Sequence, residues 1–293
     1  MQRNLLVIGA TGQTGGHTAR LLLERGHHVR TLVRRRDDAA ARLAELGAEI
    51  VEGDVQDLHS LDRATQGIDA LYFTYPILPG LMDATANVAQ AAEYNGVKAI
   101  VNMSQKSARR ESASNAARQH WVAERLLDRS PFAATHLRPT FFAEWLVNMW
   151  DGSGELRFPF ADGRHAPIAA SDQARVIAAI LEEPTPHAGK IYPLYGPVEL
   201  NHHEIAERMT RTLGRQVTYV PIELDEFEDI LKKRDMSPHM IQHLLAVAVD
   251  YRNGIFAGTN DLVSCAGNSI KICREALEDL VGVLGPDERL RVV

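Results

Sequence analysis

Cysteine is scarce in this chain of 293 residues, which contains only Cys265 and Cys273. Two cysteines cannot build a disulfide framework, and these two lack the C-x-x-C spacing of a metal or redox pair. The sequence also lacks an uninterrupted apolar run of about 18 residues, which a membrane-spanning helix requires. Its N-terminus shows no basic segment followed by an apolar core. We therefore expect a cytoplasmic protein with neither a secretion signal nor a membrane anchor.

An excess of positive charge is also missing, because the formal net charge is -6. Charged residues make up 24% of the chain and hydrophobic residues 45%, which is typical of a globular protein and gives no general footprint for nucleic acid. His202 and His203 are adjacent at an expected helix start, where neighbouring side chains point in different directions. No metal site is therefore expected there.

Short apolar runs alternate with helical patterns in the first half of the sequence. This alternation predicts an α/β fold of the Rossmann type, with a doubly wound parallel sheet. Glycines that follow helical runs predict left-handed helix ends at Gly26, Gly47, Gly67 and Gly96. The expected strands are "NLLVIG", "HVRTLV", "EIVEGD", "DALYFTYP", "KAIVNMS" and "ATHLRP".

The alternation breaks after Pro139. We expect a dinucleotide-binding domain over residues 1–150, to which residues 170–190 return, and a smaller C-terminal α/β lobe over 151–293 that binds the substrate. In the lobe, Ser171 is predicted to cap a helix, the "NHHE" segment to open another, and residues 270–285 to form the last helix.

Four glycines crowd the loop "GATGQTGG" between the first strand and the first helix. In a dinucleotide-binding unit, glycines allow a tight turn, a close approach of the pyrophosphate to the backbone, and close packing of helix on strand. The helix N-terminus adds partial positive charge. A purely structural turn is the alternative. The residues predicted to bind the cofactor here are Gly9, Thr11, Gly12, Gln13, Thr14 and Gly15.

The end of the second strand distinguishes NAD from NADP. An NAD site places Asp or Glu there for the ribose hydroxyl, whereas an NADP site offers cations to the 2′-phosphate. Here Arg34 and Arg35 follow the strand, and the first acidic residue is Asp37. Guanidinium groups suit a phosphate, so the sequence favours NADPH. The alternative is a set of solvated arginines.

Residues that follow two later strands are assigned to the cofactor because of their position in the fold. Ligands gather at the carboxyl ends of parallel strands. Asp54 and Val55 follow the third strand, where the adenine is expected. Tyr75 and Pro76 follow the fourth, where the nicotinamide ribose is expected.

Motifs in order along nearly the whole chain resemble the NmrA-like branch of the atypical short-chain dehydrogenases. This branch includes NADPH-dependent quinone oxidoreductases, flavin-free azoreductases, reductases of plant phenolics, and regulators that bind the dinucleotide without chemistry. The resemblance therefore implies the fold and the cofactor more directly than an activity. The motifs are "VIGATGQTGG", "LVRRRDD", "VEGDVQD", "VNMSQ", "HWVAERLLDRSPFAATHLRPTFFAEWL", "APIAASDQARVIAAIL" and "GKIYPLYGPVELNHHEIAERMTRTLGRQVTYV".

The Tyr-x-x-x-Lys pair of alcohol dehydrogenases of this type is absent from residues 105–130. His120 and Glu124 occupy one helix face instead, as in the quinone-reductase-like members, and Ala116 stands where the phenolic reductases have lysine. A quinone or azo acceptor needs less assistance than a ketone, since hydride delivery and orientation can suffice. His120 is either a proton donor or a surface histidine paired with Glu124.

The remaining candidates follow the fifth and sixth strands. Ser104 and Lys106 are expected near the nicotinamide, with catalytic roles. Core packing is the alternative for the aromatic residues, and Trp145 replaces an asparagine found in many relatives. Tyr251, Asn253 and Gly254 are interpreted as a turn, which is compatible with an approach to the substrate. The residues predicted to shape the pocket are Pro139, on the cofactor side, and Phe141, Phe142 and Trp145, on the substrate side.

The sequence thus predicts an NADPH-dependent oxidoreductase that delivers hydride to a small aromatic acceptor, such as a quinone or azo compound, without flavin. A non-catalytic sensor of NADP(H) is the alternative, because the tyrosine–lysine pair is missing. The apolar face of residues 240–251 is compatible with a homodimer, and burial within the lobe is its simpler explanation.

Overall fold

The computed structural model describes residues 1–259, which form two compact units. The first unit comprises residues 1–111, 116–138 and 171–192, and the second comprises 112–115, 139–170 and the residues from 193 onward. Residues 171–192 thus belong to the first unit, whereas residues 139–150, assigned to that unit from the sequence, belong to the second. Cys265, Cys273 and the expected helix over 270–285 lie outside the described residues.

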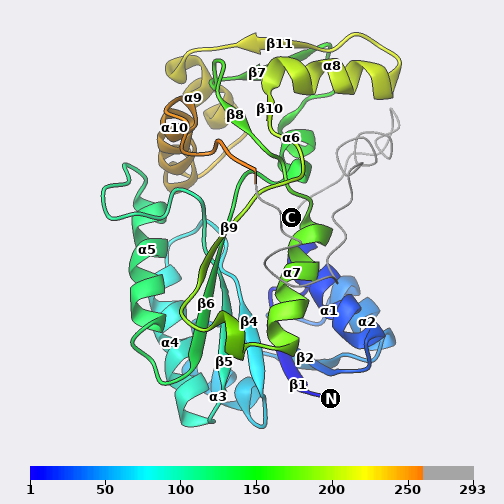
Figure 1. The fold of residues 1–293 in the computed structure, drawn as a ribbon, viewed down its shortest axis with the longest axis vertical. Coiled ribbons are helices and arrows are strands. Elements are labelled where there is room, and N and C mark those ends of the chain that lie inside the picture. Colours follow the sequence, from blue (N-terminus) through cyan, green and yellow to red (C-terminus); the bar gives the residue numbers. More distant parts are fainter. Residues whose placement is uncertain (260–293) are drawn as a thin grey trace. The chain divides into compact units, whose positions relative to one another are not determined.

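A seven-stranded sheet forms the centre of the first unit, in the order β3-β2-β1-β4-β5-β6-β9 (Figure 1). The chain winds outward from β1 in both directions, so the order reverses between β1 and β4. This arrangement confirms the doubly wound α/β fold, whose ligands bind at the carboxyl ends of the strands beside that reversal. The strands are β1 Asn4–Ile8, β2 His28–Val33, β3 Glu49–Glu52, β4 Ala70–Phe73, β5 Ala99–Met103, β6 Ala133–Pro139 and β9 Ile191–Leu194.

Strand β9 extends the sheet in parallel. The His136 amide donates to the Lys190 carbonyl and the Thr140 amide to the Leu194 carbonyl, both at 2.9 Å. Both strands advance together between these bonds, which is the parallel pattern. The "KIYPLYGP" segment therefore brings the chain back to the main sheet.

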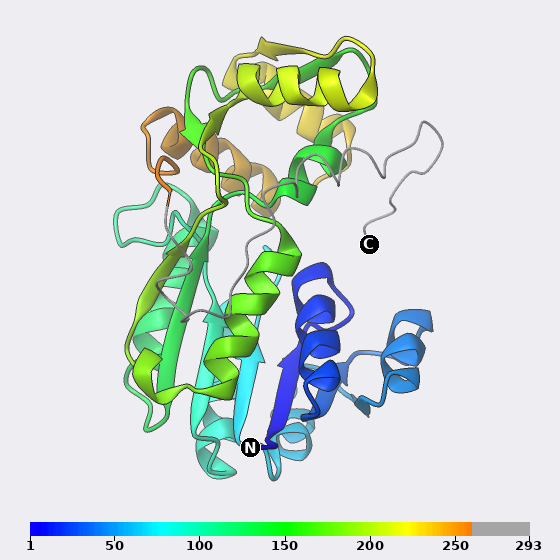
Figure 2. The ribbon, with the colours of Figure 1, turned by 45° about the vertical axis from the view of Figure 1, so that its right-hand side comes forward.

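Helices cover both faces of this sheet (Figures 1 and 2). Helices α1, α2 and α7 lie on one face, and α3, α4 and α5 on the other. The four glycines expected at helix ends have φ between 69° and 98°, which confirms the left-handed conformation. The helices are α1 Gln13–Glu24, α2 Asp38–Glu45, α3 Leu58–Thr65, α4 Leu81–Tyr94, α5 Asn115–Leu127 and α7 Ala170–Glu182.

The central strands are almost wholly buried. Leu5, Leu6 and Val7 of β1 have no exposed surface, and neither do Leu71 and Phe73 of β4. Each such side chain stabilises the fold by about 2 kcal/mol through removal from water. The two strands are therefore held firmly, and the loops at their carboxyl ends have fixed starting points.

The second unit contains two small sheets and four helices among the described residues. Strands β7 and β11 pair in parallel, and β8 and β10 pair antiparallel. Helix α6 follows β6 directly and was not predicted. The elements are α6 Ala143–Met149, β7 Glu155–Phe158, β8 Arg164–His165, β10 Leu200–Asn201, α8 His202–Leu213, β11 Thr218–Pro221, α9 Leu224–Lys233 and α10 Pro238–Arg252.

Of two helix starts predicted from the sequence, one is confirmed and the other is wrong. Asn201 and Glu204 form the expected capping box, with reciprocal bonds of 2.9 Å. The prediction that Ser171 caps α7 is wrong, because the helix already begins at Ala170. The Ala170 amide instead donates to Oε1 of Glu144 at 2.9 Å, so a distant carboxylate serves as the cap.

Candidate functional site

The glycine loop joins β1 to α1 with very little space around its backbone. Gly9 has φ of 79° and begins a tight turn. The turn is closed by the Gly12 amide, which donates to the Gly9 carbonyl at 3.0 Å. A Cβ on Gly15 would lie 2.2 Å from the Gly9 carbonyl oxygen, whereas a Cβ on Gly12 would meet its nearest atom at 3.4 Å. Gly15 therefore allows helix and loop to pack, while Gly12 keeps its outer side open.

The first turn of α1 is suited to an anion. Gly12 is the N-cap, with extended backbone and no side-chain cap, and no acidic residue lies in the first turn. The amides there are thus available to a ligand that carries negative charge. Thr11 and Gln13 are exposed beside them, and the buried Oγ1 of Thr14 has no hydrogen-bond partner within residues 1–259.

Two more buried polar atoms follow β5, at the same carboxyl edge of the sheet. Nε2 of Gln105 and Oγ of Ser107 are enclosed without a hydrogen-bond partner in the described part of the chain. Buried polar groups are normally satisfied, and a polar ligand at this edge would supply the partners that these two atoms lack. Together with the open glycine loop, they show that this edge fits a dinucleotide.

The arginines after β2 are not equivalent. Arg36 donates to the Ile50 carbonyl at 2.9 Å, and Asp37 caps α2 by accepting from the Ala40 amide at 3.0 Å. Arg34 and Arg35 are exposed, and their guanidinium groups make no hydrogen bond or ion pair with any residue of the range 1–259. The first acidic residue is thus occupied, and two guanidinium groups remain available for a phosphate.

The loop after β3 is ordered by polar contacts within the loop and with α4. Oδ1 of Asp54 accepts from the Gln56 amide at 2.9 Å, and the Val55 carbonyl accepts from Nδ2 of Asn87 at 3.3 Å. Val55 packs against the core, so it presents backbone and an apolar side chain at the carboxyl end of β3. Adenine contact at these residues stays a prediction.

Tyr75 ties this loop to the one after β4. Its hydroxyl accepts from Nε2 of Gln56 at 2.9 Å and donates to the Pro79 carbonyl at 3.0 Å, while Gln56 also reaches the Gly80 carbonyl at 2.9 Å. Sequence reasoning did not predict roles for Gln56 and Gly80. The signal was the Pro79-Gly80 dipeptide, which is typical of a turn with positive φ, and Gly80 has φ of 105°. Pro76 lies within the same loop.

Ser104 follows β5 and is connected to a buried ion pair. Its Oγ lies 2.6 Å from Oε1 of Glu124, whose side chain has no exposed surface. Arg138, at the end of β6, places Nε 2.8 Å from Oε1 and its NH2 group 2.5 Å from Oε2. A forked guanidinium–carboxylate contact of this kind is strong and directional. Arg138 was not among the residues predicted from the sequence.

His120 and Lys106 lie in the same unit as Ser104. His120 is only 4% exposed on α5, so the alternative of a surface histidine is wrong. Glu124 instead pairs with Ser104 and Arg138. Lys106 is half-buried in the turn that follows β5. Catalytic roles for His120, Ser104 and Lys106 stay predictions.

The predicted substrate aromatics lie in an aromatic cluster of the second unit. The ring centroids of Trp145 and Phe256 each lie 4.9 Å from that of Phe141. The centroids of Trp145 and Phe158 are 5.5 Å apart. This is the packing alternative stated above for Trp145. Phe142 precedes α6 as its N-cap residue. Phe141, Phe142 and Trp145 are half-buried, and Pro139 is buried at the end of β6.

Two buried histidines share the hydroxyl of Tyr251 in this cluster. Nδ1 of His165 is hydrogen-bonded to that hydroxyl, which lies 3.4 Å from Nδ1 of His202. All three side chains are fully buried; Tyr251 belongs to α10, whereas Asn253 and Gly254 form the turn interpreted from the sequence. Burial lowers the pKa of His165 to about 3 and lowers the pKa of His202 well below its usual value.

These histidines make stability depend on pH in a defined direction. Their folded-state pKa lies below the unfolded value, so the neutral rings stabilise the fold above about pH 6.5 and this contribution is lost on acidification. For His165 alone, the free energy of unfolding should fall by about 2 kcal/mol between pH 7 and pH 5. His165→Gln should remove this part of the pH dependence, as urea unfolding at both pH values will measure. Equal pH dependence in the variant and the parent would contradict the assignment.

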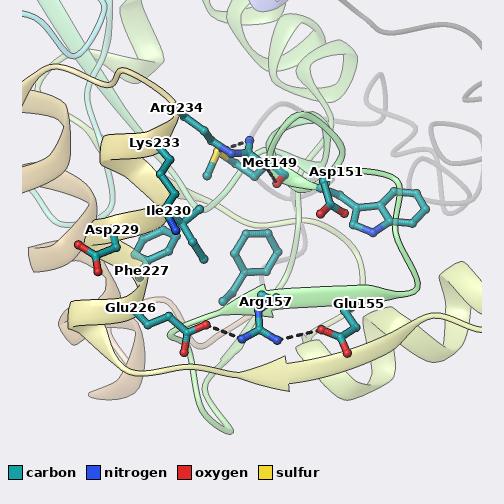
Figure 3. A pocket seen from close by; sticks show the side chains of 12 residues that line it. Met149, Asp151, Glu155, Arg157, Glu226, Phe227, Asp229, Ile230, Lys233 and Arg234 are labelled. Carbon is teal, nitrogen blue, oxygen red and sulfur yellow. Dashed lines mark hydrogen bonds and ion pairs between the residues drawn. The ribbon is translucent and has the colours of Figure 1, made fainter.

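The second unit also contains a cavity of about 440 Å³ between α6, β7 and α9 (Figure 3). Phe158 and Phe227 contribute rings to it, and Arg157 bridges Glu155 and Glu226 along its rim. Lys233 and Asp151 also line it, so both signs of charge are present and neither an anionic nor a cationic ligand is selected. The site residues predicted from the sequence do not line this cavity.

Two features are absent from residues 1–259. No helix in this range is long and apolar enough to span a bilayer. Within the same residues, histidine, cysteine and acidic side chains do not gather in groups of three that could hold a metal ion.

The chain is similar over most of its length to two reductases and to a transcriptional regulator. NAD(P)H azoreductase from Xenophilus azovorans is 30% identical over 261 residues, which cover 86% of this chain and 90% of the azoreductase. NADPH-dependent quinone oxidoreductase from Escherichia coli, solved with NADPH, has a TM-score of 0.84 at 24% identity over 96% of this chain and all of its own. The negative transcriptional regulator NmrA, solved with NADP, has a TM-score of 0.80 at 16% identity, covering 97% and 96%.

The two structural neighbours establish the shared fold. The prediction of an NADP(H) cofactor agrees with all three relatives, since two were solved with NADPH or NADP and the third is named for NAD(P)H. The model of the NmrA-like family matches residues 1–260, and the chain therefore belongs to the NmrA-like family.

Proposed function

We propose that this protein is an NADPH-dependent oxidoreductase that transfers hydride to a small aromatic acceptor, such as a quinone or an azo compound, without flavin. The observation that supports it most is the combination of an open glycine loop after β1 with two unengaged arginines after β2. The azoreductase and the quinone oxidoreductase among the relatives support the acceptor class.

Different residues of the first unit bind different parts of the cofactor. Gly12 and the first turn of α1 bind the pyrophosphate through backbone amides. Arg34 and Arg35 bind the 2′-phosphate, which NADH lacks. Ser104 and Gln105 orient the nicotinamide end, at the carboxyl end of β5. NADPH bound in this way would supply the hydride.

The chain's own contribution to the reaction is mainly orientation. Short-chain dehydrogenases use a tyrosine to protonate a ketone oxygen, and that tyrosine is missing here. A quinone or azo nitrogen accepts hydride to give a product that water protonates readily, so positioning can provide most of the rate. His120, buried on α5, is the side chain we assign to proton donation.

The test is the loss of NADPH absorbance with purified protein, using menadione and a simple azo dye as acceptors and NADH as the comparison. We expect oxidation that requires both protein and acceptor, proceeds without added flavin and is faster with NADPH. Tight binding of NADPH without oxidation by any acceptor in the panel would contradict the proposal. That result would instead favour the alternative of an NADP(H) sensor.

A further inference from the structure

Glu124 is the most completely enclosed carboxylate near the proposed nicotinamide position. Its side chain has no exposed surface, although it lies on α5, a helix that covers one face of the sheet. Burying a carboxylate is costly unless its oxygens are fully hydrogen-bonded. Arg138 donates to both oxygens, and Ser104 contacts Oε1 at 2.6 Å.

The hydrogen-bonding capacities of these groups determine the direction of each bond. A guanidinium only donates and an ionised carboxylate only accepts. Glu124 therefore accepts from Arg138 and can only accept from Ser104 as well. Ser104 must donate its hydroxyl proton to Glu124. The Ser104 oxygen then has only lone pairs to offer to any other neighbour.

A wider polar network extends from Glu124 through Arg125. Arg125 lies 3.5 Å from Oε2 of Glu124 and 2.8 Å from Oδ2 of Asp128. Asp128 in turn contacts Nε2 of His136 at 2.9 Å, and Nδ1 of His136 contacts Asn102 at 3.1 Å. The network therefore joins α5, β5 and β6, so the carboxylate has little freedom to release the serine.

We infer that Glu124, clamped by Arg138, is a positioning residue that fixes Ser104 as a hydrogen-bond acceptor for the carboxamide of the nicotinamide. The inference rests on the proposed function and refines it. Ser104 is then not the proton donor to the substrate, because its only proton is held by Glu124. Its oxygen accepts from the carboxamide N–H and thereby sets the orientation of the ring that transfers hydride.

A double-mutant cycle tests this role. Glu124→Gln keeps the shape of the side chain but replaces one acceptor oxygen with a donor, so Ser104 no longer has to point its proton toward residue 124. We expect kcat to fall about tenfold in Glu124→Gln and similarly in Ser104→Ala, with KM for NADPH changed less, since the phosphate contacts remain. The double variant should be no slower than Ser104→Ala, because Glu124 acts through Ser104.

Glu182→Gln provides the matched control. Glu182 also belongs to the first unit and pairs with Arg25 at 2.6 Å and His27 at 3.1 Å, but it does not contact Ser104. This variant should retain the parent kcat. Thermal unfolding of every variant establishes that it is folded. Multiplicative losses in the double variant would mean that Glu124 supports the fold only, and would overturn the inference.

The same cycle can be measured by binding, which separates this inference from the proposed function. NADPH affinity, followed by the fluorescence of the reduced cofactor, should fall several-fold in Glu124→Gln but not further when Ser104→Ala is already present. If the parent binds NADPH without oxidising it, the oxidoreductase proposal fails while this cycle still decides the role of Glu124. Independent effects of the two substitutions on affinity would refute that role.

Discussion

Replacing both Arg34 and Arg35 with alanine is expected to lower the preference for NADPH over NADH by at least about 100-fold, because two charge-assisted contacts with a phosphate, at about 1.5 kcal/mol or more each, amount to about 3 kcal/mol or more. The loss should appear in KM for NADPH, with KM for NADH nearly unchanged, since NADH has no 2′-phosphate. Both side chains are exposed and unengaged within the described residues, so the substitution should leave the fold intact. Steady-state kinetics with the two cofactors measure the effect.

Arg36→Ala is the control for this experiment. It removes a cation from the same loop, but one whose guanidinium is bound to the Ile50 carbonyl. We expect the ratio of NADPH to NADH efficiency to stay close to that of the parent. An equal loss of preference in Arg36→Ala would show that general positive charge, and not Arg34 and Arg35, selects the cofactor.

Gly15→Ala should have the largest effect on the apo protein. The new Cβ would lie 2.2 Å from the carbonyl oxygen of Gly9 and 2.6 Å from its carbonyl carbon, and neither backbone atom can move without displacing the end of β1. Crowding of this kind costs about 3 kcal/mol of unfolding free energy or more. NADPH binding should be lost as well, because the loop must shift. Urea unfolding and fluorescence titration measure the two consequences.

Gly12→Ala tests the approach of the cofactor separately from the packing of the loop against α1. Its Cβ would meet the Gly9 carbonyl at 3.4 Å, an ordinary contact, so the apo stability should change by no more than about 1 kcal/mol, as expected for alanine in place of glycine at an N-cap. NADPH affinity should nevertheless fall strongly, because the methyl group occupies the side from which the pyrophosphate approaches. Unchanged affinity in Gly12→Ala would contradict the placement of the pyrophosphate.

The parts of the fold that were predictable from the sequence depend on local signals. Gly26 and Gly47 follow helical runs, and only a residue that tolerates positive φ ends a helix in that way. Asn201 and Glu204 are three residues apart and form their capping box within one turn. The glycine loop is local too, since the clash at Gly15 involves atoms only six residues away along the chain.

The parts that were not predictable depend on residues far apart in the sequence. Glu124 meets Ser104 across 20 residues and Arg138 across 14, and an arginine at a strand end gives no signal of such a contact. The cap of α7 comes from Glu144, 26 residues before it, which is why Ser171 was chosen wrongly. His165 and Tyr251 are 86 residues apart, so only the folded chain shows that they share a hydrogen bond.

The central claim is that this protein transfers hydride from NADPH to an aromatic acceptor, and single-turnover mixing tests it most directly. The protein would be saturated with NADPH, or with NADPH deuterated at the transferred position, and mixed rapidly with menadione while the absorbance of the reduced cofactor is followed. We expect a single decay that depends on the acceptor and is slower with the deuterated cofactor. Bound NADPH that persists unchanged in the presence of menadione and of an azo dye would contradict the claim.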